Sequence, residues 1–180
     1  MLVTAFGPFG GRGVNASSLA LVRLRQMHPG LATRILPVDL VEAPRRLGDA
    51  VRRVRPRTLV LLGEAGNAKH IRLESRAWNE LDFTIPDLAG RQPRGRRIDP
   101  SAADFVETTV DIPALLKRLR ASGIKAEAST DPGRYLCNRL YHAALSRFCM
   151  PSLFIHLPLE SILPTEEAAR VITIVLAEIG

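Results

Sequence analysis

Short aliphatic runs alternate along the chain with segments whose apolar residues have helical spacing or that begin with a helix cap. The runs that predict strands are residues 2–6, 32–38, 58–63, 124–129 and 152–158. Helices are predicted to begin at Ser17 or Ser18, near Pro44, after Asp111, near Tyr135 and at Thr165. Such an alternation is typical of a largely parallel sheet that is covered by helices. We therefore predict an α/β fold.

The segment HIRLESRAWN, residues 70–79, alternates strictly between apolar or small residues and polar or large ones. This period of two predicts one strand. It places Glu74 on a mixed face between Arg72 and Arg76. A carboxylate in that position is more often part of a surface ion-pair ladder than a catalytic group. Spacing alone therefore leaves the role of Glu74 open.

Residues 84–100 contain three prolines, two glycines and most of the local charge. We predict a long surface loop, and long loops in compact domains are often functional. The loop contains RQPRGRR, residues 91–97, which is the one tight basic cluster in a chain with a formal net charge of +7. No aromatic residues for base stacking lie within this cluster, and the other arginines are scattered. We therefore expect a solvated basic surface and no nucleic acid partner.

Composition is consistent with one domain, residues 1–180, because a chain of this length with 46% apolar residues buries one substantial core. The first residues, MLVTAFGPFGG, lack the basic region of a signal peptide, and no apolar run is long enough to span a bilayer. The two cysteines form neither a disulfide framework nor a zinc motif. We expect a reducing, cytoplasmic setting.

The stretch GRYLCNRLYH, residues 133–142, places Cys137 in the first turn of a predicted helix. Cys137 and Tyr141 share an apolar helical face, and this pattern alone favours a buried core cysteine. The helix start favours a nucleophile instead, because the positive end of the helix dipole stabilises a thiolate. Cys149 lies at the other end of the helix, so we interpret it as structural.

A cysteine nucleophile needs a base, usually a histidine, and often a third group that orients the base. His28, His70 and His142 are predicted at a helix end, in a loop and on a different face of the Cys137 helix. His156 differs because it is a polar residue in the apolar run LFIHLP, near the carboxyl edge where open α/β sheets bind ligands. A core histidine with satisfied hydrogen bonds is the alternative interpretation.

The glycine-rich stretch FGPFGGRGVN follows the first predicted strand, where phosphate-binding loops occur. It matches neither GxxxxGK[ST] nor GxGxxG, so we do not expect a nucleotide site. Phe6 and Phe9 suggest instead an apolar slot at the carboxyl edge of the sheet, with Asn15 as a hydrogen-bonding group. Ordinary packing of both rings against the first helix is the alternative.

Four of these segments, taken in order, resemble one family, the pyroglutamyl peptidase I or pyrrolidone-carboxylate peptidase family of cysteine peptidases. AFGPFGGRGVNAS resembles the family signature GFxPFGG...NPS, and GEAGNAKHIRLESRAWN resembles G-x-A-G...I-x-x-E-x-x-A-x-N. DPGRYLCN and FIHLP are similar to the cysteine and histidine motifs. The matches extend from residue 3 to about residue 158, and four motifs in order are far more specific than any one.

The resemblance implies a three-layer α/β/α fold with a largely parallel twisted sheet flanked by helices. It implies Cys137 as nucleophile, His156 as general base and acid, and Glu74 as the carboxylate that orients His156. The predicted substrate-binding residues are Phe6, Phe9, Asn15 and Glu64. The resemblance further implies that no metal or cofactor is needed and that the bond after an N-terminal pyroglutamyl (5-oxoproline) residue is hydrolysed. It also implies self-association as a homo-oligomer, here a dimer or tetramer.

The sequence departs from the family pattern around these motifs. Thr84 and Ala68 stand where members usually have arginines, and Ala16 replaces the proline of NPS. Glu64 stands where glutamine or an apolar residue is common. We expect these changes to alter the surroundings of the thiol, and an arginine from 91–97 to be a candidate for replacing the lost charge.

Three functions are compatible with these observations. The first is an omega peptidase that removes N-terminal pyroglutamate. The second keeps the Cys-His-Glu residues but hydrolyses another small N-acyl amide or lactam, as Thr84, Ala68 and Glu64 suggest. The third is a non-enzymatic basic binding protein, suggested only by the net charge and by residues 91–97.

Overall fold

Six strands form the central sheet of the computed structural model, which describes residues 1–180. They are β1 (Leu2–Phe6), β2 (Ala32–Leu36), β3 (Leu59–Glu64), β4 (Ile71–Glu74), β9 (Ala126–Ser129) and β10 (Ser152–Leu157). Their order across the sheet is β2-β1-β3-β10-β4-β9. All neighbouring strands are parallel except β10 and β4. The predicted largely parallel sheet is confirmed.

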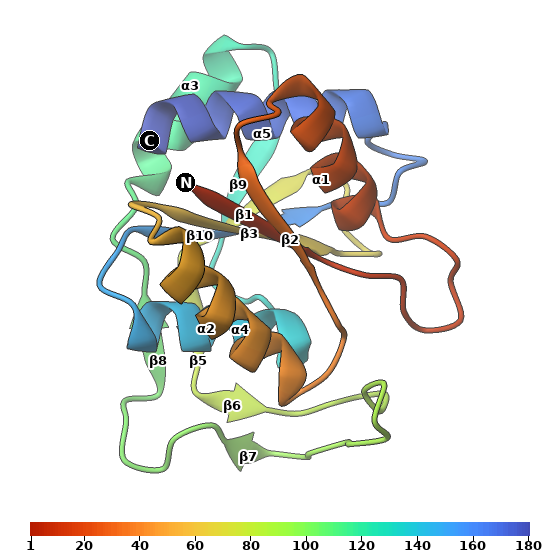
Figure 1. Cartoon of the computed structure of the whole chain (residues 1–180), viewed down its shortest axis with the longest axis vertical. Helices are drawn as coiled ribbons and strands as arrows, with labels where there is room; N and C mark the ends of the chain where they lie inside the picture. The colour runs from red at the N-terminus through yellow and green to blue at the C-terminus, as the bar shows by residue number, and fades with distance from the viewer.

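Five helices cover the two faces of this sheet. They are α1 (Ala16–Met27), α2 (Glu42–Val54), α3 (Ile112–Ala121), α4 (Leu136–Arg147) and α5 (Thr165–Ile179). Figure 1 shows α1, α3 and α5 on one side of the sheet and α2 and α4 on the other, so the predicted three-layer α/β/α fold is confirmed. None of the five is both long and apolar enough to cross a membrane.

Each face of the sheet has its own hydrophobic core, because alternate residues of every strand point in opposite directions. In β10, Leu153, Ile155 and Leu157 pack under α1, α3 and α5, whereas Phe154 packs towards α2 and α4. The same alternation assigns His156 to the α2 and α4 face. It also assigns Gly63 in β3 to that face, because Leu59 and Leu61 belong to the same core.

Two local predictions were wrong in detail. The cap of α1 is Asn15 rather than Ser17 or Ser18, and its side chain accepts a hydrogen bond from the Ser17 N–H. Residues 70–79 do not form one strand, because the chain leaves the sheet at Ser75. There the Ser75 carbonyl accepts from the Thr108 N–H, outside the central sheet.

Beyond that break, two small antiparallel pairs extend below α2 and α4. They are β5 (Arg76–Trp78) with β8 (Phe105–Glu107), and β6 (Glu80–Leu81) with β7 (Arg96–Arg97). Figure 1 shows β6 and β7 at the end of the molecule farthest from α5. The predicted surface loop at 84–100 is therefore largely irregular but contains β7, whose two residues are too few to give a periodic signal.

Candidate active site

His156 and Glu74 form a buried hydrogen-bonded pair on the α2 and α4 face of the sheet. His156 Nδ1 lies 2.8 Å from Glu74 Oε1, and the two residues are 6% and 0% exposed. Antiparallel pairing of β10 with β4 places Phe154 directly opposite Glu74. His156 is two residues beyond Phe154 on the same face, so its side chain reaches Glu74 diagonally across the two strands. Tyr141 of α4 donates a hydrogen bond of 2.8 Å to the Glu74 carbonyl and holds this end of β4 in place.

The alternative interpretation of Glu74, as a member of a surface ion-pair ladder, is wrong. Both neighbouring arginines bind other carboxylates: Arg72 pairs with Glu127 and Arg76 pairs with Glu107. Glu74 itself is fully buried and has only His156 as a cationic partner. A buried carboxylate is costly unless it is paired, so this hydrogen bond stabilises both groups.

Cys137 is the second residue of α4 and lies against the carboxyl end of β3. The first turn of α4 has no side-chain cap and no acidic residue, so its N–H groups and the positive end of its dipole are not neutralised. The thiol is half-buried and packs on Gly63, where an added Cβ would be only 3.0 Å from the Cys137 sulfur. Gly63 is aligned with His156 in the parallel pairing of β3 and β10.

The pKa of His156 depends on both Cys137 and Glu74. Burial lowers the pKa of His156, but the charge of Cys137 and its hydrogen bond, followed by those of Glu74, raise it to about 9. The imidazole is therefore protonated at neutral pH and lies beside the Cys137 sulfur. Because Nδ1 is bound to Glu74, Nε2 remains as the nitrogen that can exchange a proton with the thiol.

A cavity of about 290 Å³ opens beside Cys137. It is mainly apolar, and its lining includes all four predicted substrate-binding residues. The main lining residues are Phe6, Phe9, Arg12, Val14, Asn15, Val38, Glu64, Ile85, Tyr135 and Cys137. Its size and composition are those of a site for a small, largely uncharged group.

Asn15 closes the glycine-rich loop onto α1. Its Nδ2 donates to the Gly7 carbonyl at 3.3 Å, and its Oδ1 accepts from both the N–H and the hydroxyl of Ser17. A primary amide has two N–H donors, so one N–H of Asn15 remains for a ligand in the cavity.

Glu64 brings no net charge to the cavity. Its Oε1 lies 2.6 Å from Arg12 Nη1, and its Oε2 accepts a hydrogen bond of 2.7 Å from the Ala16 N–H. None of the arginines of residues 91–97, which were candidates for replacing the missing family arginines, lines the cavity. The arginine that does line it, Arg12, is paired with Glu64. Ala68 is fully buried, and Thr84 is exposed outside the cavity lining.

Sequence reasoning did not identify Tyr135 as part of the site. Its ring packs 4.5 Å from Phe83 and 5.4 Å from Phe9, and its hydroxyl donates to the Pro86 carbonyl at 3.1 Å. Its place two residues before Cys137, at the start of the same helix, was the available signal. Tyr135 joins the loop at 84–100 to the cavity wall.

Asn138 was also missed, although it directly follows Cys137. Its side chain is fully buried and makes three hydrogen bonds to the backbone of Trp78 and Glu80. These bonds attach the chain after β4 to the first turn of α4. The first turn of α4, which contains Cys137, is therefore fixed to the backbone of Trp78 and Glu80.

The other predicted candidates lie elsewhere. His70 is exposed, and His28 contacts Thr173 on the far side of the sheet. His142 is buried against Ser146, and burial, followed by the nearby Arg139, lowers its pKa. Cys149 is exposed beyond the end of α4. Cys137 therefore has one histidine beside it, and that histidine is His156.

Comparison with known proteins gives one consistent result. The profile of the pyroglutamyl peptidase family matches residues 1–171. The pyrrolidone-carboxylate peptidase of Thermococcus onnurineus is 33% identical over 165 residues, which cover 88% of this chain and 82% of that protein. A second such peptidase, from Caldanaerobacter subterraneus, is 31% identical over 88% of this chain and 80% of its own length.

Solved structures agree with the sequence matches. The crystal structure of pyrrolidone carboxyl peptidase from Thermus thermophilus superposes with a TM-score of 0.90, at 32% identity, over 97% of both chains. Pyroglutamyl peptidase I from Bacillus amyloliquefaciens superposes with a TM-score of 0.91, at 27% identity, over 99% of this chain and 93% of that one. The likeness extends through the sheet and the helices on both of its faces.

Proposed function

This chain belongs to the pyroglutamyl peptidase family, and we propose that Cys137, His156 and Glu74 are the residues with which it removes N-terminal pyroglutamate. It is a cysteine peptidase that hydrolyses the amide bond after an N-terminal pyroglutamyl residue. One observation supports the proposed residues above the others. The buried pair of Glu74 and His156 adjoins the thiol that lines the apolar cavity.

The reaction begins with attack by the Cys137 thiolate on the pyroglutamyl carbonyl carbon. The N–H groups of the uncapped first turn of α4 stabilise the negative oxygen of the tetrahedral intermediate. His156 Nε2 then donates a proton to the departing amine as the carbon–nitrogen bond breaks, which leaves a thioester. Glu74 holds Nδ1 and stabilises the imidazolium throughout.

Water completes the cycle. His156, now neutral, accepts a proton from the water as its oxygen attacks the thioester carbon. The carbon–sulfur bond breaks, free pyroglutamate leaves, and the thiolate and imidazolium are restored.

Recognition of the substrate depends on the neutrality of the cavity. A pyroglutamyl group has no ammonium, because its nitrogen is part of a lactam ring. Phe6 and Phe9 offer apolar surface to the ring, and the free N–H of Asn15 is a donor for a lactam or acyl oxygen. Glu64 is neutralised by Arg12 and Ala16, so a free amino terminus would find no unpaired carboxylate there.

A pyroglutamyl amide of a fluorescent amine tests the assignment. Reduced wild-type protein should release the amine, and both Cys137→Ser and His156→Ala should release none above background. Phe9→Ala should raise KM more than it lowers kcat, because it removes ring contacts and leaves the reacting groups in place. Undiminished turnover by Cys137→Ser would overturn the assignment of the nucleophile.

The proposal includes a homo-oligomer, either a dimer or a tetramer, in a cytoplasmic setting. Both rest on the family resemblance and on the absence of a disulfide framework in the sequence. No metal or cofactor takes part in the proposed steps. Light scattering during size-exclusion chromatography gives the subunit number, and a monomer at micromolar concentration would contradict the proposed oligomer.

A further inference from the structure

A second cavity, of about 610 Å³, lies on the side of α4 that faces away from Cys137. Arg139, Ala143 and Arg147 line it at intervals of four residues, which place them on one stripe of the helix. The cavity is bounded by α2 on one side and by β7 on the other. It shares no lining residue with the Cys137 cavity, so the peptidase reaction does not account for it.

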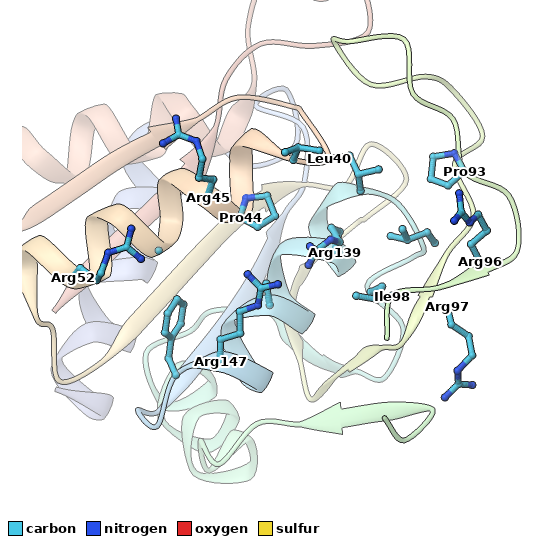
Figure 2. Close-up of a pocket in the computed structure, with 15 residues that line it drawn as sticks. Leu40, Pro44, Arg45, Arg52, Pro93, Arg96, Arg97, Ile98, Arg139 and Arg147 are labelled. Carbon is cyan, nitrogen blue, oxygen red and sulfur yellow. The ribbon is translucent and has the colours of Figure 1, made fainter. Parts of the chain in front are cut away.

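Arginines dominate the polar lining of this cavity, which we call the arginine groove. They are Arg45 and Arg52 from α2, Arg139 and Arg147 from α4, and Arg96 and Arg97 from β7. Figure 2 shows these side chains around the groove, with Arg52 on the α2 side, Arg139 and Arg147 in the middle, and Arg96 on the β7 side. No aspartate or glutamate lines it.

Half of these arginines already have carboxylate partners. Arg45 and Arg52 pair with Asp49 on the same helix, and Arg97 pairs with Asp104. Arg96, Arg139 and Arg147 form no ion pair and donate no hydrogen bond from their side chains. The groove therefore contains three guanidinium groups, from two separate elements, whose charge is not compensated within the chain.

Arg139 is the least solvated of the three. It is half-buried, and burial, followed by the charge of Arg147, lowers its pKa. The partial removal of Arg139 from water and the like charge of Arg147, two turns along α4, both destabilise the Arg139 cation. A bound anion would compensate these charges, so binding would gain the free energy that their repulsion costs in the unbound protein.

The shape and floor of the groove indicate what kind of anion fits. A guanidinium group binds phosphate through two parallel hydrogen bonds, and several such groups match more than one phosphate. Apolar side chains line the rest of the groove, including Leu81, Ile98 and Phe148. Its volume is that of a small-molecule site.

We propose that the arginine groove binds a small molecule that carries two or more phosphate groups on an apolar or aromatic body. Arg139, Arg147 and Arg96 hold the phosphates, and the apolar floor contacts the body. Binding at this groove is separate from the peptidase reaction, so either assignment can fail without the other.

Isothermal titration calorimetry on the reduced full-length chain tests this proposal, with inorganic tripolyphosphate and adenosine diphosphate as probes. Both should bind, and their affinities should fall as salt rises because the contacts are ionic. The double variant Arg139→Ala/Arg147→Ala should lose about tenfold or more in affinity for each probe, because charge-assisted hydrogen bonds are lost. Turnover of the pyroglutamyl amide should be unchanged, which shows that the variant is folded.

The matched control is Arg25→Ala/Arg170→Ala. These exposed arginines lie on α1 and α5, line no part of the groove, and account for the same loss of charge. The control should retain its affinity within about twofold, since long-range charge effects are screened at moderate salt. Arg139→Lys/Arg147→Lys keeps the charge but loses the paired hydrogen bonds, so its affinity should lie between those of wild type and the alanine variant.

Three results would overturn the proposal. They are no binding of either probe, equal losses in the groove variant and the control, and displacement of adenosine diphosphate by a short oligonucleotide or an oligoglutamate peptide at lower concentration than by tripolyphosphate. The last result would identify a macromolecular partner instead of a small phosphorylated molecule.

Discussion

The two faces of the central sheet are built from different residues. Under α1, α3 and α5, the buried core consists only of alanine, valine, leucine and isoleucine. On the opposite face, under α2 and α4, the core contains four aromatic residues: Phe6, Phe83, Tyr141 and Phe154. The proposed catalytic residues and both cavities described above lie on this second face. The aliphatic face under α1, α3 and α5 therefore contributes mainly to stability. The face under α2 and α4 also holds the cavities and the buried polar groups.

Aromatic residues suit the second face because their flat rings fix the orientation of neighbouring groups. The Phe154 ring lies 4.8 Å from the His156 ring and 5.6 Å from the Tyr141 ring. Tyr141 in turn donates its hydroxyl hydrogen bond to the backbone of Glu74. Aliphatic side chains would fill the same volume without offering a hydrogen bond or a flat surface. The imidazole is therefore held by a carboxylate on one side and a ring on another.

Removal of the proposed nucleophile should produce the largest effect on the α2 and α4 face. Cys137→Ala should lower kcat/KM for a pyroglutamyl amide by about 10⁴-fold or more, since no covalent intermediate forms. The melting temperature should change little, because the thiol is only half-buried. The matched control is Cys149→Ala at the exposed site beyond the same helix, and it should keep wild-type activity. Equal losses in both variants would contradict the distinction between the two cysteines.

Glu74→Gln should have the next largest effect, a loss of about a hundredfold or more in kcat, because the imidazolium loses its buried partner. The wild-type pKa of His156 is raised to about 9. Loss of the carboxylate charge disfavours the protonated ring and lowers that pKa, so the alkaline limb of the kcat/KM profile should move to lower pH.

A pH profile of the initial rate measures this shift, and Glu127→Gln is its control. Glu127 is the exposed partner of Arg72 on the neighbouring strand β9, so its loss should leave both kcat and the alkaline limb unchanged. An alkaline limb that stays in place in Glu74→Gln would mean that Glu74 does not set the protonation of His156.

Gly63→Ala should have a smaller effect, but it should lower both stability and activity. The added Cβ would lie 2.8 Å from the Phe154 ring and 3.0 Å from the Cys137 sulfur. Overpacking of this kind costs about 1–3 kcal/mol in the free energy of unfolding. Displacement of the sulfur should also lower kcat/KM by about tenfold to a hundredfold. Urea denaturation and turnover measure the two effects on the same sample.

Gly48→Ala is the control for that substitution. Gly48 lies within α2, and its added Cβ would meet only the end of the flexible Arg52 side chain, at 3.3 Å. Replacement of a helical glycine by alanine should stabilise the protein by about 0.5–1 kcal/mol and leave turnover unchanged. A Gly63→Ala variant that behaved like Gly48→Ala would mean that the sheet absorbs the added methyl group without moving the sulfur.

Much of the aliphatic face could be predicted from the sequence, because its strands are short aliphatic runs and its helices begin close to recognisable start signals. Asp111, for example, caps α3 as predicted. The choice of Asn15 over Ser17 as the cap of α1 could not be predicted. It depends on the Gly7 carbonyl, which the folded loop brings to the Asn15 amide.

The catalytic face was harder to predict from pattern alone, because its contacts join distant segments. Glu74 and His156 are 82 positions apart, and only the family motifs linked them. The arginine groove gathers residues from α2, β7 and α4, and each segment by itself resembles a solvated basic surface. Two-residue strands such as β6 and β7 give no periodic signal, so the side of the arginine groove that they form could not be predicted.

The smallest expected effect tests the division between the two faces within a single strand. Ile155 lies in the aliphatic core, between Phe154 and His156, whose side chains point to the other face. Ile155→Val removes one buried methylene, so the free energy of unfolding should fall by about 0.5–1.5 kcal/mol. Turnover should not change, because no atom on the catalytic face is touched. Phe154→Leu is the matched variant and should lower kcat/KM, since the imidazole loses its neighbouring ring. If Ile155→Val lowered kcat/KM as much as Phe154→Leu, the sheet would transmit packing changes between its faces, and their separation into stability and chemistry would be wrong.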